Sequence, residues 1–195
     1  MNQKLLKALL DYDPETGSFT WKRRTPDLFD DSRGYAERSC KAWNNKFLKK
    51  TPGHLTEDGY ITIGIFNKNY LAHKLAWIWM TGSTPDEIDH ADRNKSNNKW
   101  DNLRAATRPQ NAANKLKNRT NTSGFKGVFW HPGASKWMAQ ICVNRRSIYL
   151  GIFDCPAAAS LAYQIEAHRQ HGEFALVDRI RCYGGDTPET AYAAG

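Results

Sequence analysis

The chain has 195 residues with 28 Lys and Arg against 20 Asp and Glu, a formal net charge of +8, and 40% hydrophobic residues. This composition excludes a wholly disordered chain and suffices for one large domain or two small ones. No apolar run approaches the roughly 20 residues of a membrane-spanning helix, and residues 1–10 lack the features of a signal peptide, so we expect a cytoplasmic protein.

The charge distribution favours a nucleic-acid partner, and the cysteine spacing argues against a zinc site. Between Arg93 and Arg119 there are eight basic residues and one acidic residue, Asp101. Such a stretch can be an ordinary solvated face, but its concentration favours a polyanionic partner, most simply nucleic acid. The cysteines have neither a Cys-x-x-Cys pair nor the spacing of a zinc site, so we expect reduced thiols at Cys40, Cys142, Cys155 and Cys182.

The first 50 residues predict a short helix, a turn and one strand. Leucines at helical spacing occupy residues 5–10, turn formers occupy residues 11–17, and residues 19–21 have the composition of a strand. Residues 23–38 show no periodicity and predict a loop. Two aromatic residues should then return the chain to the core: Trp43 and Phe47.

The middle of the chain predicts two hairpins, each followed by a helix. Residues 60–72 alternate as a hairpin should and lead into a helix that ends near Gly82. A second, polar hairpin is expected from Ile88 to Arg104. The segment Thr107–Gln110 then has the form of a capping box, which predicts a helix running toward Leu116.

The last third predicts a linker, three strands and a helix. Residues 117–123 are polar and poor in helix formers. Three strand-like segments follow, at residues 126–130, 136–143 and 146–151. Asp154 is expected to cap a helix over residues 155–171 that ends at Gly172 and turns four residues inward, namely Ala158, Leu161, Ala162 and Ile165.

Four polar residues in the second hairpin and its helix stand out as a candidate site. Asp89 and His90 lie on the first expected strand, Asn102 on the return strand and Asn111 in the first turn of the helix. The many asparagines of this stretch have one plain explanation in turn chemistry. The other is a phosphodiester site, which needs a base for water, an oxygen ligand for a divalent cation, a group that fixes the base, and cations for phosphates.

At these residues the sequence resembles the HNH nuclease family, in particular its phage and homing endonuclease branch. The resemblance covers residues 70–115 through the segments Leu71–Trp77, Ile88–His90, Asn97–Asn98, Asn102–Arg104 and Thr107–Asn111. It implies a ββα-metal fold, with His90 as general base, Asn102 as the residue that orients it and braces the loop, and Asp89 and Asn111 as ligands of Mg²⁺ or Mn²⁺. The family commonly has Gly where this chain has Arg93, so a turn with positive φ would be strained there.

Residues 124–178 resemble a second family, the Apetala/ethylene-response-factor DNA-binding domain of plants. The similarity lies in the segments Ser123–Val128, Lys136–Ala139, Tyr149–Phe153 and Ala157–Tyr163. It implies a three-stranded sheet that contacts the DNA major groove, backed by the helix. The alternative is an ordinary hairpin with solvated arginines in its turn.

Together these features predict an α+β DNA endonuclease that nicks duplex DNA. We expect a nuclease region at 1–116 with its ββα core at about 86–116, a linker at 117–123, a DNA-binding domain at 124–178 and a tail at 179–195. Double-stranded DNA would be the partner of a monomer, with no small-molecule substrate, in a bacterial or phage-infected cytoplasm. The alternatives are a DNA-binding regulator without catalysis and, more remotely, an RNA-binding module. The expected DNA contacts are Arg93, Lys95, Arg104, Arg108, Lys126, Trp130, Lys136, Gln140, Arg145, Arg146 and Tyr149.

Overall fold

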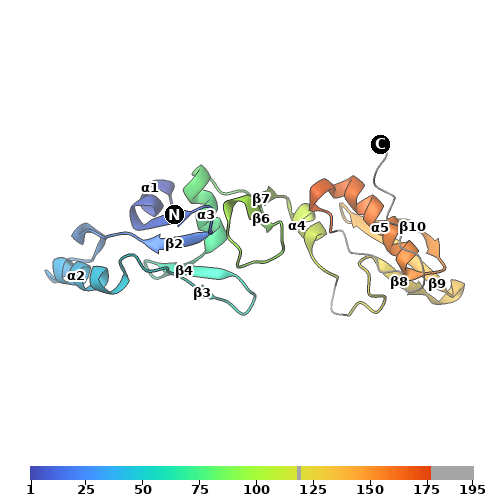
Figure 1. Ribbon diagram of the computed structural model, residues 1–195, viewed down its shortest axis with the longest axis horizontal. Helices are drawn as coiled ribbons and strands as arrows, with labels where there is room; N and C mark the ends of the chain where they lie inside the picture. The colour runs from blue at the N-terminus through green and yellow to red at the C-terminus, as the bar shows by residue number, and fades with distance from the viewer. Residues whose placement is uncertain (118–119, 177–195) are drawn as a thin grey trace. The chain divides into compact units, whose positions relative to one another are not determined.

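The computed structural model describes residues 1–117 and 120–176, and its α+β elements, drawn in Figure 1, divide into two compact units with the boundary in the chain between Thr107 and Arg108. The α+β class expected from the sequence is confirmed. Among the described residues, no helix has the length and apolar character to cross a membrane. The tail expected at 179–195, with Cys182, lies outside the described residues, whereas Cys40, Cys142 and Cys155 are free thiols.

The first unit begins with a helix and a hairpin. Helix α1 (Gln3–Leu9) is capped by the Asn2 side chain, which accepts a hydrogen bond from the Leu5 N–H at 2.8 Å. Strands β1 (Leu10–Asp13) and β2 (Ser18–Trp21) pair antiparallel. Sequence reasoning assigned residues 10–13 to the helix end and the turn, because the leucine spacing hides the alternation by which Leu10 and Tyr12 enter the core.

The segment expected to be a loop contains a 3-10 helix η1 (Pro26–Leu28) and the start of helix α2 (Ala36–Phe47). Helix α2 buries a stripe of small or polar residues, Ala36, Cys40 and Asn44, so its sequence carries no apolar period to predict it. The expectation for its two aromatic residues is confirmed, because both pack against the core.

A three-stranded sheet follows, with the strand order β3-β4-β5. Strand β3 (His54–Leu55) was not predicted, whereas β4 (Ile61–Ile65) and β5 (Lys68–Leu71) form the expected hairpin. Helix α3 (Ala72–Thr81) ends at Gly82, whose φ of 76° lies in the left-handed region.

The second hairpin pairs β6 (Glu87–His90) with β7 (Leu103–Ala106), and Asp89 lies opposite Arg104. Between the strands lies the 3-10 helix η2 (Trp100–Asn102). Asn102 is therefore the last residue of this turn and not a residue of the return strand, as the sequence had suggested.

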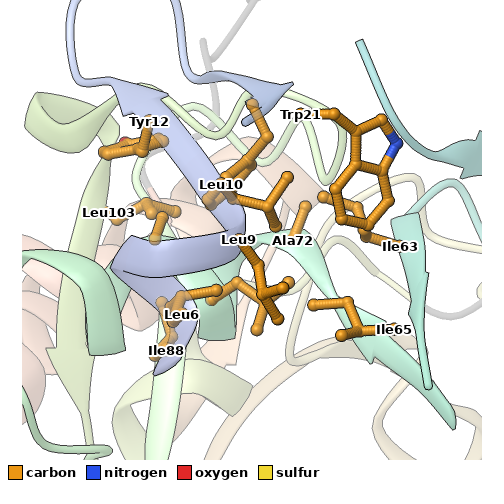
Figure 2. Packing of buried hydrophobic residues seen from close by; sticks show 13 residues of the cluster. Leu6, Leu9, Leu10, Tyr12, Trp21, Ile63, Ile65, Ala72, Ile88 and Leu103 are labelled. Carbon is orange, nitrogen blue, oxygen red and sulfur yellow. The ribbon is translucent and has the colours of Figure 1, made fainter. Parts of the chain in front are cut away.

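The N-terminal elements complete the core under this hairpin. Leu6, Leu9 and Leu10 are fully buried, and Figure 2 shows them among side chains of the hairpin and of β4, namely Ile88, Leu103, Ile63 and Ile65. A two-stranded sheet is marginal by itself in water. The α1–β1–β2 segment therefore supplies the apolar surface on which β6 and β7 are stable.

The β1–β2 hairpin also holds the loop between β6 and β7. The Tyr12 hydroxyl donates to the Asn98 carbonyl at 2.7 Å, and the Trp100 N–H donates to the Pro14 carbonyl at 3.0 Å. Gly17, with a φ of +72°, lies so close to the backbone of Asn98 and Lys99 that a Cβ atom there would overlap it.

In the second unit, α4 (Arg108–Asn114) precedes three strands in the order β10-β9-β8, which are β8 (Val128–His131), β9 (Lys136–Val143) and β10 (Arg146–Phe153). A 3-10 helix η3 (Pro132–Ala134) joins β8 to β9. Helix α5 (Pro156–His171) packs on this sheet and leads into η4 (Gly172–Phe174). The expected three-stranded antiparallel sheet on one helix is confirmed.

Two expectations about α5 are wrong. Its cap is Cys155, whose Sγ accepts from the Ala158 N–H, because Asp154 pairs instead with Lys136 at 2.8 Å. The buried face consists of Ala159, Ser160, Tyr163 and Ala167. Leu161 and Ile165 remain 47% and 58% exposed and Ala158 is exposed, whereas Ala162 packs against the core as expected. Small residues allow the helix to approach the sheet closely, and Gly127 makes room for the Tyr163 ring.

The expected linker, residues 117–123, lies within the second unit, and residues 118 and 119 fall outside the described part. Its described residues are held by local hydrogen bonds. The Asn121 side chain donates to the Phe125 carbonyl at 2.9 Å and accepts from the Gly124 N–H at 2.9 Å.

Gly17→Ala should lower the free energy of unfolding by about 2–4 kcal/mol, because it adds a Cβ against backbone and places a non-glycine residue at positive φ. Gly34→Ala is the matched control: its φ is +69°, but nothing lies within 4 Å of its Cβ position. It should cost about 1 kcal/mol. Urea unfolding of both variants measures the difference, and equal losses would contradict the close packing at Gly17.

Candidate active site

Asp89 and His90 end strand β6, and each is only 5% exposed. Burial of two adjacent residues means that both faces of the strand are covered at this end. Burying a carboxylate and an imidazole is costly unless each has polar partners, so their contacts define what the site can do.

The imidazole of His90 is oriented by a residue to which sequence reasoning gave no role. Its Nε2 lies 3.4 Å from Oδ1 of Asn98, and Asn98 in turn donates from Nδ2 to the Ser96 carbonyl at 3.2 Å. Because the amide oxygen only accepts, this arrangement puts the proton on Nε2 and the lone pair on Nδ1. Burial is the main cause that lowers the pKa of His90, so the ring is neutral near pH 7.

Asn102 holds the loop that follows His90. Its Nδ2 donates to the Asp92 carboxylate at 2.9 Å and to the Asn97 carbonyl at 2.8 Å, and its Oδ1 accepts from the Asp92 N–H at 3.0 Å. Burial pulls the pKa of Asp92 upward, but hydrogen bonds from Asn97, from the Asn94 N–H and from Asn102 together bring it below its ordinary value. A charged Asp92 therefore fixes the loop through three asparagines.

The turn after His90 has a positive φ at Arg93, the position at which the related family commonly has Gly. Arg93 has a φ of +65°, and its N–H donates to the His90 carbonyl at 2.9 Å. The left-handed conformation costs a non-glycine residue about 1–2 kcal/mol. Arg93 is exposed, so the strained turn carries a cation at the surface, three residues after His90.

Asp89 and Arg104 form an ion pair across the hairpin. Both Nε and Nη2 of Arg104 donate to Oδ2 of Asp89, at 2.9 and 2.8 Å. The guanidinium of Arg104 thus balances a buried carboxylate, and its expected contact with DNA stays a prediction.

A second histidine, His73, lies against the His90 ring. The ring centroids are 5.1 Å apart at an interplanar angle of 86°, and the Tyr60 ring lies 5.3 Å from His73. His73 is 5% exposed, and its Nδ1 is buried without a hydrogen-bond partner among the described residues. Burial, followed by the nearby His90 and Lys74, lowers the pKa of His73 to about 3.

Lys95, an expected DNA contact, covers the outer side of this aromatic group. Its Nζ lies 4.7 Å from the Tyr60 ring centroid and donates to the Asp58 carbonyl at 3.0 Å. The lysine itself is exposed. A basic surface therefore adjoins the buried histidines within the first unit.

The second unit begins with α4, which carries two of the expected site residues. Asn111 and Arg108 lie on α4, and their roles in metal and DNA binding stay predictions. Lys126 donates from Nζ to carbonyls of Ala112, Ala113 and Lys115 at 2.7–3.1 Å. These carbonyls lie at and just after the end of α4, so the Lys126 ammonium caps this helix, and its expected contact with DNA stays a prediction.

The register of the sheet separates the other expected DNA contacts. Ala139 and Ile141 face α5, so Lys136, Gln140 and Tyr149 share the opposite face. Trp130 lies opposite Trp137 with ring centroids 5.1 Å apart, on the α5 side. Arg146 lies opposite Val143, also on the α5 side, and Arg145 lies in the turn with a φ of +63°. Trp130 and Arg146 therefore do not share the face of Lys136, Gln140 and Tyr149, and the DNA contacts of all these residues stay predictions.

Stability should fall as the pH drops below about 6.5, because the unfolded chain then binds a proton that buried His73 refuses. The loss from this residue reaches about 2 kcal/mol at pH 5. His73→Phe should flatten the dependence in urea unfolding between pH 7.5 and 5. His54→Gln, at an exposed histidine, is the control and should keep the wild-type slope. Parallel curves for His73→Phe and wild type would contradict the assignment.

Comparison with known proteins places the site in context. A family model described as HNH endonuclease matches residues 70–113. Protein 3.8 of Escherichia phage T7 is 30% identical over 112 residues, which cover 56% of this chain and 92% of that protein. No solved structure matches the chain. The family match contains Asp89, His90 and Asn102, and it lends no support to the plant-domain resemblance of residues 124–178.

Proposed function

The chain belongs to the HNH endonuclease family, and we propose that it cleaves phosphodiester bonds in double-stranded DNA with a divalent metal, by nicking one strand. One observation carries this proposal: His90 at the end of β6 is buried and neutral, and its Nε2 faces the amide oxygen of Asn98. Such an imidazole is suited to accept a proton from water.

In the proposed reaction His90 is the general base, acting through Nδ1. Asn98 holds the ring in the required tautomer, and Asn102 keeps the loop that carries Asn98 in place. Burial prevents the ring from being protonated in advance at neutral pH. Arg93 and Lys95 supply exposed positive charge for the DNA backbone.

The donor atoms suit a hard cation. Asp89 would hold it in the first unit, and the oxygens of a carboxylate suit Mg²⁺ or Mn²⁺. In residues 1–117 and 120–176 no group of three or more His, Cys, Asp or Glu is arranged for metal. Mg²⁺ is commonly held by one or two protein ligands, with water and phosphate oxygens completing its coordination. When bound, the cation supplies stabilisation of negative charge on the phosphate and leaving oxygen.

His90→Ala should lower the rate of plasmid nicking by about a hundredfold or more, because the base is lost. The measurement is the conversion of supercoiled plasmid to open circle with Mg²⁺ or Mn²⁺, and EDTA should abolish it. His54→Ala, at an exposed histidine, should retain wild-type activity. Binding of DNA without cleavage by the wild type in any metal would favour the alternative, a DNA-binding regulator.

We further propose that the exposed face of the β8–β9–β10 sheet binds the DNA duplex. Lys136 and Tyr149 lie on this face, and their neighbours Phe129 and Ile152 are 48% and 38% exposed. Exposed apolar residues beside a cation indicate a binding surface, and a strand ribbon fits the major groove. Arg145, in the exposed turn between β9 and β10, adds positive charge.

Lys136→Gln and Tyr149→Ser should each weaken duplex binding about fivefold, and Lys136→Gln should reduce the slope of affinity against salt by about one. Arg169→Gln is the matched control, because it also removes one cation from a surface ion pair, on α5. Fluorescence anisotropy with a labelled duplex, in EDTA, measures these affinities. An equal effect of the Arg169 control would contradict a role for this face.

A further inference from the structure

A second concave site lies in the first unit, apart from the residues of the active site. It is an open pocket of about 840 Å³ bordered by the end of β2, the segment after it, α2 and the β4–β5 turn. Aromatic rings dominate its lining, from Trp21, Phe29, Trp43, Phe47 and Phe66. Asn67 and Asn69 contribute amides at its edge. Aromatic rings combined with amides are typical of sites that bind planar heterocycles.

The pocket contains a buried arginine. Arg24 is 8% exposed, and its guanidinium carbon lies 3.8 Å from the Trp43 ring centroid and 5.3 Å from that of Phe66. Its Nε is buried and has no hydrogen-bond partner among the residues that the structure describes. Asn44 binds the Arg24 backbone through the N–H and the carbonyl, at 2.9 Å each, so the main chain is fixed independently of the side chain.

The charge of Arg24 is not balanced by a carboxylate within the described residues. Asp30 lines the same pocket, but its two oxygens accept from the Ser32 N–H and hydroxyl at 2.9 and 3.0 Å. Buried cations are normally paired, and contact with aromatic rings offsets only part of the cost of burial. An anion bound in the pocket would offset the rest of the cost of burying the Arg24 charge.

Phe66 is held at the rim in an unfavourable conformation. Its φ is +47°, that of Asn67 is +60°, and the Phe66 ring is 44% exposed. A bulky residue gains nothing from a left-handed φ in a turn, where Asn or Gly is the ordinary choice. The turn therefore presents an exposed ring over Arg24 at a cost to the fold.

Three lysines contact residues that line the pocket. Lys46 lies 5.1 Å from the Phe47 ring, and Trp21 exchanges backbone hydrogen bonds with Lys49 and Lys50, at 2.9 and 3.0 Å. These three lysines are exposed. The site thus combines stacking surfaces and one buried planar cation, with exposed lysines on neighbouring residues, and these are features of single-strand recognition.

We propose that this pocket binds an unstacked nucleotide of the DNA substrate, with its base against the rings of Trp43 and Phe66 and its phosphate paired with Arg24. The proposal rests on DNA being the substrate, as proposed above. It assigns residues 22–69 a role in substrate recognition separate from cleavage at His90. Arg24 is the better cation for this position, because its planar guanidinium can stack on a ring and bind a phosphate at once.

Affinity for a single-stranded 12-mer tests the proposal, using the full chain in EDTA and fluorescence anisotropy. Arg24→Gln should weaken binding about tenfold, whereas Arg23→Gln, at the exposed neighbour with the same charge change, should alter it less than twofold. Phe66→Asn removes the ring at a φ that Asn tolerates, so the fold is preserved, and it should also weaken binding about tenfold.

Two further probes separate the base from the phosphate. A 12-mer with 2-aminopurine at its centre should lose fluorescence on binding to the wild type, and less so with Phe66→Asn. A second pair of 12-mers is abasic throughout, except that one strand carries a single base at its centre. The strand without this base should bind about tenfold more weakly, because it offers nothing for stacking.

Equal binding by Arg24→Gln and Arg23→Gln, or equal binding of the strands with and without the central base, would overturn the proposal. Absence of any single-strand binding by the wild type would do the same. These measurements contain no metal and require no cleavage, so they are independent of the plasmid assay. If the Arg24 and Phe66 variants nick plasmid and bind the single strand with unchanged affinity, the nuclease proposal stands and the nucleotide-binding pocket is ruled out.

Discussion

The hydrogen bond from the Tyr12 hydroxyl to the Asn98 carbonyl connects the N-terminal hairpin to the residue that orients His90. The β6–β7 hairpin is too small to hold a buried histidine by its own contacts. Its loop is fixed on one side by this bond and by the close approach of Gly17, and on the other by Asn102. The geometry of the base therefore depends on residues almost eighty positions earlier in the chain.

Electrostatic balance in the active site is achieved largely by neutralisation and pairing. His90 and His73 are kept neutral by burial, and Asp89 is paired with Arg104. Because two neutral rings in contact do not repel each other, the histidines can lie side by side without a counterion. The exposed cations Arg93 and Lys95 remain available at the surface, where water reduces the cost of their charge.

The sequence predicted best where periodicity or turn chemistry is strong. Alternating residues in β4 and β9 and the left-handed Gly82 were recognised, and the pair Asp89–His90 was identified by its setting. Sequence spacing did not reveal the hydrogen-bond partners of two basic residues or the buried face of α5. Arg104 donates to a carboxylate and Lys126 to helix carbonyls. Similarly, α5 buries alanines and Tyr163 while larger aliphatic residues face outward.

The contact between Lys126 and the end of α4 has a consequence for how the polypeptide can be divided. The family segment, residues 70–113, includes most of α4 but neither the ammonium that completes that helix nor the N-terminal leucines that fill the core beneath β6. The range that matches the family model is therefore shorter than the part of the chain that supports its fold. A minimal fragment that retains its native form has to begin at α1 and extend past residue 126.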